Sequence, residues 1–279
     1  MASELHLFVC LHVRRNIFLS FKAHALSLPS ANELIDEIPL CDPLTLHKVC
    51  EHVSNTLARE LRADFEDVLS KTPVDHTYEY SARAVAQRAL VNKIYGYLSR
   101  LADPKIEAKL LERMRTATNM TDEISALASL DYDCPSRSIA MQEFFDKWKS
   151  NPLVLLKWLT LSAASNLPGN VDNVRRIAGS DAFKITNPNC CYSLFGGFAS
   201  SSVNYHAADG SGYAYLADVV LQLDKINYQV ASRIVSKFTS FKQYDATRQA
   251  AIKAQLQRIV DTPDLSPNVF EVAHACLSK

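Results

Sequence analysis

Two short runs of this 279-residue sequence carry residue types that bind metals or phosphate groups in other proteins. His47, Cys50 and His52 are metal-ligand types, but a helix turns positions 47 and 52 about 140° apart, so the two imidazoles do not share a face. Because a zinc site needs convergent ligands, we expect no metal site here. Residues 209–212 (Asp-Gly-Ser-Gly) lack the longer Gly-x-x-x-x-Gly-Lys frame of a phosphate loop, and we expect them to cap a helix instead.

Seven cysteines offer thiol chemistry, and two of them, Cys190 and Cys191, are adjacent. No Cys-x-x-Cys pair occurs, the count is odd and the spacings are irregular, so the pattern does not predict a disulfide framework. Nothing in the sequence around the adjacent pair activates a thiol, and we expect both to be unreactive. These features indicate a reducing compartment, and the cytoplasm is the expected location.

The charge balance argues against some classes of partner. Lys plus Arg is 30 and Asp plus Glu is 30, so no net field attracts nucleic acid or an anionic membrane. The apolar patches near the beginning are interrupted by Arg14 and Arg15 and are too short for a membrane span. We therefore expect neither nucleic acid nor a membrane as partner, and we treat residues 1–22 as an uncertain N-terminal segment.

Three helix starts follow one another in the last third of the chain. Asn187 before Pro188 is an N-cap residue followed by the residue best suited to the first helical turn. The turn at residues 209–211 supplies polar oxygens for the free N–H groups of the second helix. The second and third helices each carry an apolar face: Tyr213, Leu216, Val219, Val220 and Leu223, and then Val230, Ile234, Phe238 and Phe241. The other face of the third helix is polar without being simply charged, with Gln229, Ser232, Arg233 and Ser236.

The upstream sequence predicts further helices. Asp42-Pro43 opens a long helix whose apolar positions continue to Leu69, and later helices open at Ser81, at Asp103-Pro104 and at Thr121. No run of alternating residues bounded by hairpin turns is present. Helices of roughly 10 to 25 residues joined by short loops predict an all-α fold, an α-solenoid of irregular antiparallel helix pairs (armadillo/HEAT-like). No fixed sequence period is visible, so a regular repeat array is not predicted.

This ordered set of motifs resembles the C-terminal helical domain of the aminopeptidase N family, the alanyl aminopeptidases of the gluzincin metallopeptidases, which remove N-terminal residues from peptides. The resemblance rests first on the run from Asn187 to Gln249. Upstream matches are Leu28-Pro29-Ser30 with Asn32-Glu33, Asn119-Met120-Thr121-Asp122, Met141-Gln142-Glu143, Asp146-Lys147-Trp148 and Lys157-Trp158. We take residues 23–279 as one aminopeptidase N-type C-terminal helical domain.

The resemblance covers only the last part of such an enzyme. These aminopeptidases bind zinc through His-Glu-x-x-His on one helix, with the Glu as general base. None of the eight His here is followed by Glu, and the Gly-x-Met-Glu-Asn segment that holds the substrate's amino group is absent. We therefore expect no catalytic residue, metal ligand or cofactor in this chain; by resemblance it is a fragment of a zinc metallo-aminopeptidase, and zinc belongs to the intact parent enzyme.

The resemblance also assigns two substrate-binding residues. In the parent enzymes this domain closes over the catalytic domain and encloses a chamber for peptides, and the two positions that reach the chamber match Gln229 and Arg233. They would line the pocket for the first substrate residue and offer a charge-assisted hydrogen bond toward the peptide; the alternative is that both merely cover a neighbouring helix. Many members carry basic residues where Cys190 and Tyr192 stand and an acidic one at Ala208, so an account of peptide C-terminus binding is not carried over.

Two hypotheses follow. In the first, the chain is the chamber-closing C-terminal domain of a zinc aminopeptidase, inactive alone, with the catalytic and N-terminal domains of the parent as partners and a peptide as substrate of the intact enzyme. In the second, it is a free-standing helical-repeat scaffold that binds proteins. The retained Gln229 and Arg233 favour the first. A self-sufficient enzyme would need a site of an unrecognised kind.

Overall fold

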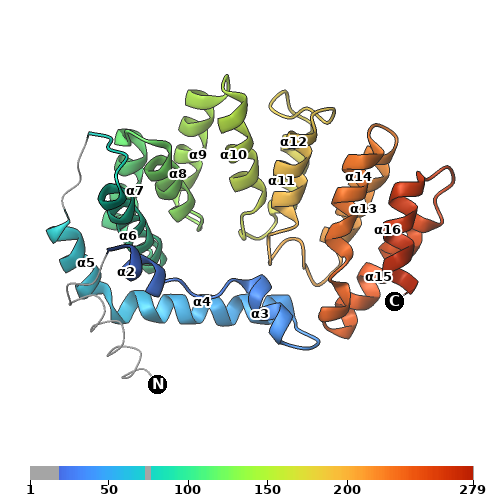
Figure 1. The fold of residues 1–279 in the computed structure, drawn as a ribbon, viewed down its shortest axis with the longest axis horizontal. Coiled ribbons are helices and arrows are strands. Elements are labelled where there is room, and N and C mark those ends of the chain that lie inside the picture. The colour runs from blue at the N-terminus through green and yellow to red at the C-terminus, as the bar shows by residue number, and fades with distance from the viewer. Residues whose placement is uncertain (1–18, 73–76, 279) are drawn as a thin grey trace. The chain divides into compact units, whose positions relative to one another are not determined.

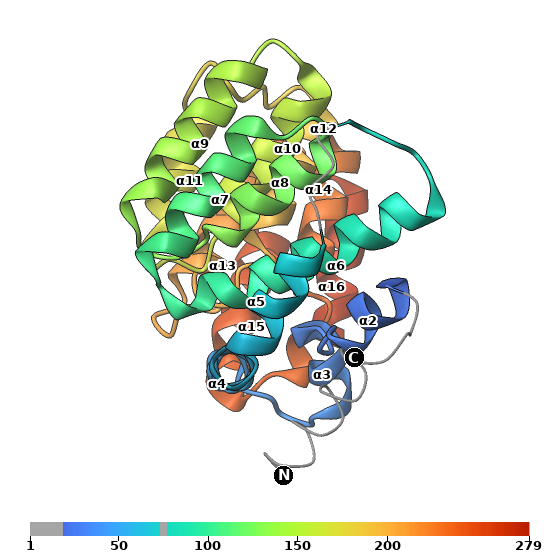
Figure 2. The same ribbon diagram turned by 90° about the vertical axis from the view of Figure 1, so that its left-hand side faces the viewer.

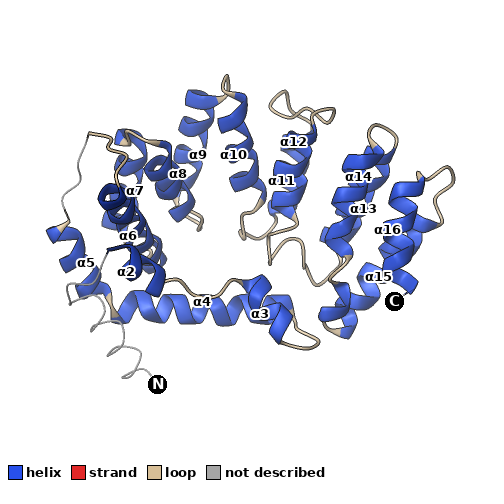
Figure 3. Cartoon of the chain, in the orientation of Figure 1, coloured by secondary structure: helices blue, strands red, loops and turns tan. Residues whose placement is uncertain are grey.

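The computed structural model describes residues 19–72 and 77–278, and helices make up the regular structure of these residues (Figures 1 and 3). They form two compact units: one contains the described residues up to Ser30 together with Val49–Ala140, and the other contains Ala31–Lys48 with the described part of Met141–Lys279. Within the described residues the β-structure is limited to an isolated parallel bridge between Cys41 and Tyr244. The predicted all-α fold is confirmed.

The first unit is built from helices that pack as neighbours, with α7 and α8 side by side in two views (Figures 1 and 2). Its helices are α2 (Leu19–Ala25), α5 (Arg62–Lys71), α6 (Ala82–Leu98), η1 (Ser99–Leu101), α7 (Pro104–Thr116) and α8 (Met120–Ser129). Two further helices, α4 (Pro43–Glu60) and α9 (Pro135–Trp148), each have one end in this unit and one in the other. Phe65 and Tyr97 stack in the core with ring centroids 5.5 Å apart, and the Tyr97 hydroxyl donates to the carbonyl of Leu26 at 2.6 Å. These contacts anchor α2 and α5 to α6.

The helix starts of this unit show where the sequence-based predictions succeed. The Ser81 hydroxyl accepts from the amide of Ala84, and the carboxylate of Asp103 accepts from the amide of Lys105, as N-caps do. The prediction of a start at Thr121 is wrong by two residues, because the side chain of Asn119 caps α8. The long helix opened by Asp42-Pro43 is two helices, since Leu61, with φ −102° and ψ 8°, leaves helical geometry between α4 and α5.

The second unit consists mainly of helix hairpins, in which α13 packs on α14 and α15 packs on α16. Its helices are α3 (Ala31–Glu37), α10 (Pro152–Ala163), α11 (Asn170–Ala178), α12 (Pro188–Cys191), the π-helix η2 (Tyr192–Gly196), α13 (Ser211–Asp224), α14 (Tyr228–Val235), the 3₁₀ turns η3 (Ser236–Phe238) and η4 (Phe241–Gln243), α15 (Ala246–Val260) and α16 (Pro267–Ser278). All nine apolar residues predicted for the faces of the second and third helices are buried. The third helix, however, ends at Val235, where the Ser236 hydroxyl donates to the carbonyl of Arg233 and 3₁₀ turns follow.

Two further expectations concern the ends and surfaces of the chain. Residues 1–18 of the N-terminal segment set apart as residues 1–22 lie outside the described residues, and the boundary at residue 23 falls inside α2, so the domain limits stay a prediction. Among the described residues, no helix is both long enough and apolar enough to cross a lipid bilayer.

Candidate functional site

The segment after Asn187 forms the first wall of the candidate site. The Asn187 carboxamide accepts from the amide of Asn189 at 3.0 Å, with Pro188 in the first helical turn, so the predicted start of α12 is confirmed. The chain then enters the π-helix η2, a rare geometry that is frequent at functional sites. The first residue of η2, Tyr192, is half-buried. Sequence patterns did not predict this π-helix.

The adjacent cysteines lie beneath this wall. Both Cys190 and Cys191 are buried, and the Cys191 thiol donates to the carbonyl of Ile185 at 3.1 Å. Burial, and then the neighbouring Cys190, raise the pKa of Cys191 to about 11, which keeps it a thiol at neutral pH. Both cysteines are therefore packing residues, and Tyr192 is the residue of this wall that can contact a polar group.

Helix α14 provides the second wall and carries both predicted substrate-binding residues. The Asn227 side chain caps it by accepting from the amides of Gln229 and Val230. Val230 and Ile234 are buried at 3% and 1% exposure, whereas Gln229 and Arg233, one residue earlier in each turn, are exposed. Residues four apart lie on one helix face, so the two polar side chains share the solvent side of α14.

The two walls meet at Arg233, whose guanidinium carbon lies 4.8 Å from the centre of the Tyr192 ring. A guanidinium over an aromatic face is held in place while its N–H groups stay available to a ligand. Arg233 forms no ion pair with a carboxylate of the described residues, and the Gln229 side chain makes no hydrogen bond there. This pair presents a cation, amide donors and an amide acceptor to solvent, a set that matches the carbonyls and carboxylates of a peptide.

A second polar group in the same unit was missed by sequence reasoning. The Arg248 cluster consists of Asp42, His206, Tyr213, Asp245 and Arg248. Nη1 of Arg248 lies 2.7 Å from a carboxylate oxygen of Asp245 and 3.0 Å from one of Asp42, and Nη2 donates to the carbonyl of His206 at 3.4 Å. His206 Nδ1 and the Tyr213 hydroxyl share a hydrogen bond of 2.7 Å.

Burial sets the charge state of the Arg248 cluster. Burial first, and the charge of Arg248 second, lower the pKa of His206 to about 3, so the imidazole is neutral at physiological pH. Burial also raises the pKa of Tyr213 above its usual value, which keeps its hydroxyl protonated. The side chain of Arg248 is only 9% exposed. The local sequence carries no signal for this cluster, because Arg248 stands between Thr247 and Gln249 and its contacts with Asp42 and His206 are tertiary.

A zinc ion, which the aminopeptidase resemblance implies for the parent enzyme, finds no donor set among residues 19–72 and 77–278. The sequence has no His-Glu-x-x-His, and in the part of the chain that the structure describes no three His, Cys, Asp or Glu side chains converge to hold a metal ion. His47, Cys50 and His52 all lie on α4 without forming such a group. The residues present do not fit the metal, and no step of chemistry through zinc is derived for them.

Residues 11–278 match the family described as "Domain of unknown function (DUF3458_C) ARM repeats". The chain belongs to this family. The armadillo/HEAT-like class predicted from the sequence is thereby confirmed. Membership of the DUF3458_C family assigns a repeat architecture but, by its own description, no function.

Similar proteins connect this DUF3458_C domain with aminopeptidases, which confirms the resemblance seen in the sequence. Aminopeptidase N of Escherichia coli is 34% identical over 251 residues, covering 89% of this chain and 29% of its own length. Aminopeptidase N of Caulobacter vibrioides is 33% identical over 262 residues, covering 92% of this chain and 30% of its own length. The crystal structure of Legionella pneumophila aminopeptidase A in complex with aspartic acid has a TM-score of 0.89 and 27% identity, covering 98% of this chain and 33% of that one. The DUF3458_C chain thus spans about a third or less of the proteins that it matches.

Proposed function

We propose that this chain is the chamber-closing C-terminal domain of a zinc aminopeptidase that removes N-terminal residues from peptides, and that it is inactive alone. One observation carries the proposal: the match to Escherichia coli aminopeptidase N covers 89% of this chain but only 29% of that enzyme. The absent His-Glu-x-x-His motif supports it, because the zinc and its general base must come from the remaining part of such an enzyme. The partners are the catalytic and N-terminal domains of the parent enzyme.

Gln229 and Arg233 are the substrate-binding residues of this proposal. Both are exposed on α14, and the Tyr192 ring restrains the guanidinium of Arg233 from the side. A restrained donor loses less conformational entropy when it binds a peptide carbonyl or carboxylate. Gln229 adds a donor and an acceptor one turn away, so the pair would orient the first residues of a peptide. We place the protein in the cytoplasm, where thiols such as Cys190 and Cys191 remain reduced.

Hydrolysis of alanyl, leucyl and arginyl amide substrates tests the proposal. The purified chain is assayed with added zinc, alone and together with a catalytic fragment of a related aminopeptidase. We expect no turnover by the chain alone, and restored or altered turnover in the mixture. Chelator-sensitive turnover by the chain alone would overturn the argument from the missing zinc motif. No complementation, with the chain capturing other proteins, would favour the helical-repeat scaffold.

Variants separate the pocket residues from the rest of the surface in the complemented enzyme. Gln229→Ala and Arg233→Ala should raise KM by roughly three- to tenfold, because each removes an exposed polar contact to the substrate. The matched control is Lys253→Ala, which removes an exposed cation from α15 of the same unit and should leave KM unchanged. Equal effects of all three substitutions would count against the assignment of Gln229 and Arg233.

A further inference from the structure

A cleft in the first unit lies entirely outside the candidate site. It has a volume of about 340 Å³ and is lined by the segment 77–79, by one face of α6 and by residues of α7, α8 and the turn between them. Pockets that bind small molecules begin at about this size, roughly 300 Å³. None of its lining residues belongs to the second unit, so the cleft exists within one compact part of the chain.

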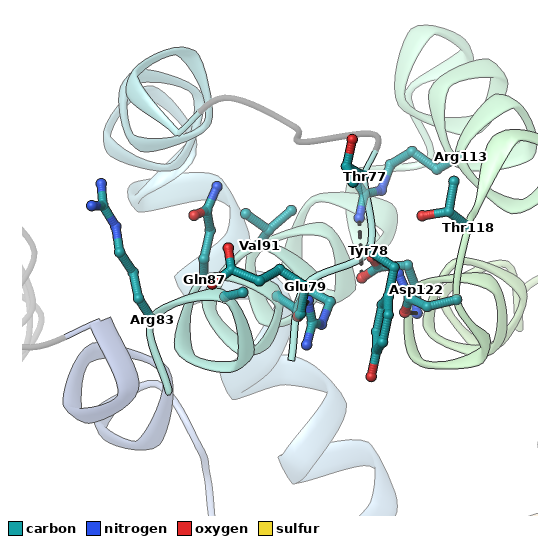
Figure 4. Close-up of a pocket in the computed structure, with 12 residues that line it drawn as sticks. Thr77, Tyr78, Glu79, Arg83, Gln87, Val91, Arg113, Thr118 and Asp122 are labelled. Atoms are coloured by element: carbon teal, nitrogen blue, oxygen red, sulfur yellow. Dashed lines mark hydrogen bonds and ion pairs between the residues drawn. The ribbon is translucent and has the colours of Figure 1, made fainter. Parts of the chain in front are cut away.

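Helix α6 presents a polar row to this cleft. Arg83, Gln87 and Val91 follow one another at steps of four residues and therefore share a face. Figure 4 shows the three side chains projecting toward the same side, with Thr77 and Arg113 across from them. The row ends in an apolar residue, Val91, which is buried at 6% exposure. Along α6 the lining of the cleft thus changes from a charged residue to an apolar one.

The floor of the cleft is fixed by internal hydrogen bonds. Asn92 donates to a carboxylate oxygen of Asp122 at 2.8 Å, and Asn119 donates to the other oxygen at 2.8 Å. Arg113 donates to Asn92 at 3.0 Å and lies 3.9 Å from Asp122, and its guanidinium carbon is 4.5 Å from the centre of the Tyr95 ring. The charges of Arg113 and Asp122 therefore offset each other, and the floor is preorganised.

The wall made by residues 77–79 is held by Arg88. This guanidinium lies over the Tyr78 ring, with 5.1 Å between Cζ and the ring centre, and donates to the carbonyl of Glu79 at 3.1 Å. The contact fixes the backbone that carries the Glu79 carboxylate. Two charges of the lining then remain without an ion pair or side-chain hydrogen bond among the described residues: the carboxylate of Glu79 and the guanidinium of Arg83.

We propose that this cleft binds a small zwitterion, an amino acid or a dipeptide, with its carboxylate at Arg83 and its ammonium at Glu79. The two side chains have opposite charge and line one cleft, yet no salt bridge of 4.0 Å or less joins them, so a ligand with both charges satisfies both at once. A ligand with only one charge pairs with one of these side chains and leaves the other to water. The side chain of the ligand lies toward Val91 and Ala84.

Titration of the full chain with matched ligands tests the proposal by calorimetry. The probes are leucine, alanyl-leucine, alanyl-leucine amide (which lacks the carboxylate) and N-acetyl-alanyl-leucine (which lacks the ammonium). We expect saturable binding of leucine or alanyl-leucine, and whichever binds more tightly identifies the size of the ligand. Each capped peptide should bind roughly three- to tenfold more weakly than alanyl-leucine, the range expected for losing one partly exposed charge contact.

Variants assign each charge of the ligand to a residue. Arg83→Gln should lower the affinity for alanyl-leucine roughly three- to tenfold but leave the affinity for alanyl-leucine amide unchanged. Glu79→Gln should lower the affinity for alanyl-leucine by the same factor but leave the affinity for N-acetyl-alanyl-leucine unchanged. The control is Lys109→Gln, which removes a cation of α7 that pairs with Glu112 outside the cleft. No saturable binding, or equal loss for capped and free peptides in the variants, would overturn the proposal. Because both substituted residues are exposed, the variants should keep the far-UV circular dichroism of the parent chain.

Discussion

Two arginines of the second unit, Arg233 and Arg248, stand only fifteen positions apart but have opposite surroundings. Arg248 is 9% exposed and lies between the carboxylates of Asp42 and Asp245, whereas Arg233 is exposed and rests on the ring of Tyr192. A buried guanidinium must be paired because desolvating a charge is costly, and in Arg248 both Nη groups are committed to protein acceptors. An exposed guanidinium on an aromatic ring keeps its donors for a ligand. The difference separates a charge that holds the fold from one that is available for recognition.

The largest effect should come from Gly212, which allows the chain around the Arg248 cluster to pack closely. A Cβ at this position would lie 2.3 Å from the carbonyl oxygen of Asn204 and 2.4 Å from that of Tyr205. Because both neighbours are backbone atoms, Gly212→Ala forces the segment before His206 away from α13. We expect a loss of about 3–5 kcal/mol in the free energy of unfolding, measured by urea denaturation. Gly196→Ala is the matched control, since no atom lies within 4 Å of an added Cβ there, and equal losses would contradict the close-packing argument.

Removal of Arg248 should have the next largest effect. Arg248→Ala leaves Asp42 and Asp245 without their shared cation; because these carboxylates are 38% and 25% exposed, the expected loss is about 2–3 kcal/mol, less than for a fully buried pair. Arg248→Lys keeps the charge but loses the fork that reaches the two carboxylates through Nη1 and the His206 carbonyl through Nη2. Its stability should fall between those of the parent chain and Arg248→Ala. Denaturant titrations of the parent chain and the two variants measure the order of their free energies of unfolding. If Arg248→Ala left the free energy of unfolding unchanged, the proposed difference between a structural Arg248 and an available Arg233 would be wrong.

Acid should weaken the Arg248 cluster through His206. The imidazole faces Tyr213, Tyr205 and Tyr244, the charged side chains of Arg248, Asp245 and Asp42 are close enough to act on it, and its pKa is lowered from 6.5 to about 3. Below pH 6.5 the unfolded chain takes up a proton that the folded chain refuses, so stability falls with falling pH until about pH 3. The slope is about 1.4 kcal/mol per pH unit, or roughly 2 kcal/mol by pH 5.

The control for this pH dependence is a side chain that cannot titrate. His206→Gln should lower the free energy of unfolding at pH 7 but remove the contribution of His206 to its decrease between pH 6.5 and 5. Urea denaturation at each pH measures this. An unchanged slope in the variant would show that His206 is not the source of the acid sensitivity in this pH range.

The smallest effect on stability should come from Arg233. Its exposed contact with Tyr192 is worth about 0.5–1 kcal/mol at most, so Arg233→Ala should change the free energy of unfolding by about 0.5 kcal/mol. Tyr192→Phe, which keeps a ring under the guanidinium, should change it less. A destabilisation comparable to that of Arg248→Ala would show that Arg233 is a structural residue and would weaken its proposed role in substrate binding.

The sequence by itself determined the local features of this protein. Asn187 and Ser81 cap helices as predicted, and the apolar faces that begin at Tyr213 and Val230 are buried, because capping and helical periodicity depend on residues within a few positions of one another. The placement of Gln229 and Arg233 on one exposed face followed from the same periodicity. The family resemblance also lay in the order of such local motifs.

Tertiary structure decided what depends on residues far apart in the chain. The pairing of Asp42 with Arg248, the position of Tyr192 under Arg233 and the closure of the cleft in the first unit by residues of α7 and α8 all arise from packing between separate segments. The break at Leu61 and the capping of α8 by Asn119 rather than Thr121 were also not predicted. Leu61 continues the apolar periodicity, and both Asn119 and Thr121 are residue types that cap helices. A local pattern fixes which face of a helix is polar, but only the packed neighbours decide whether a charge on that face is paired or left for a ligand.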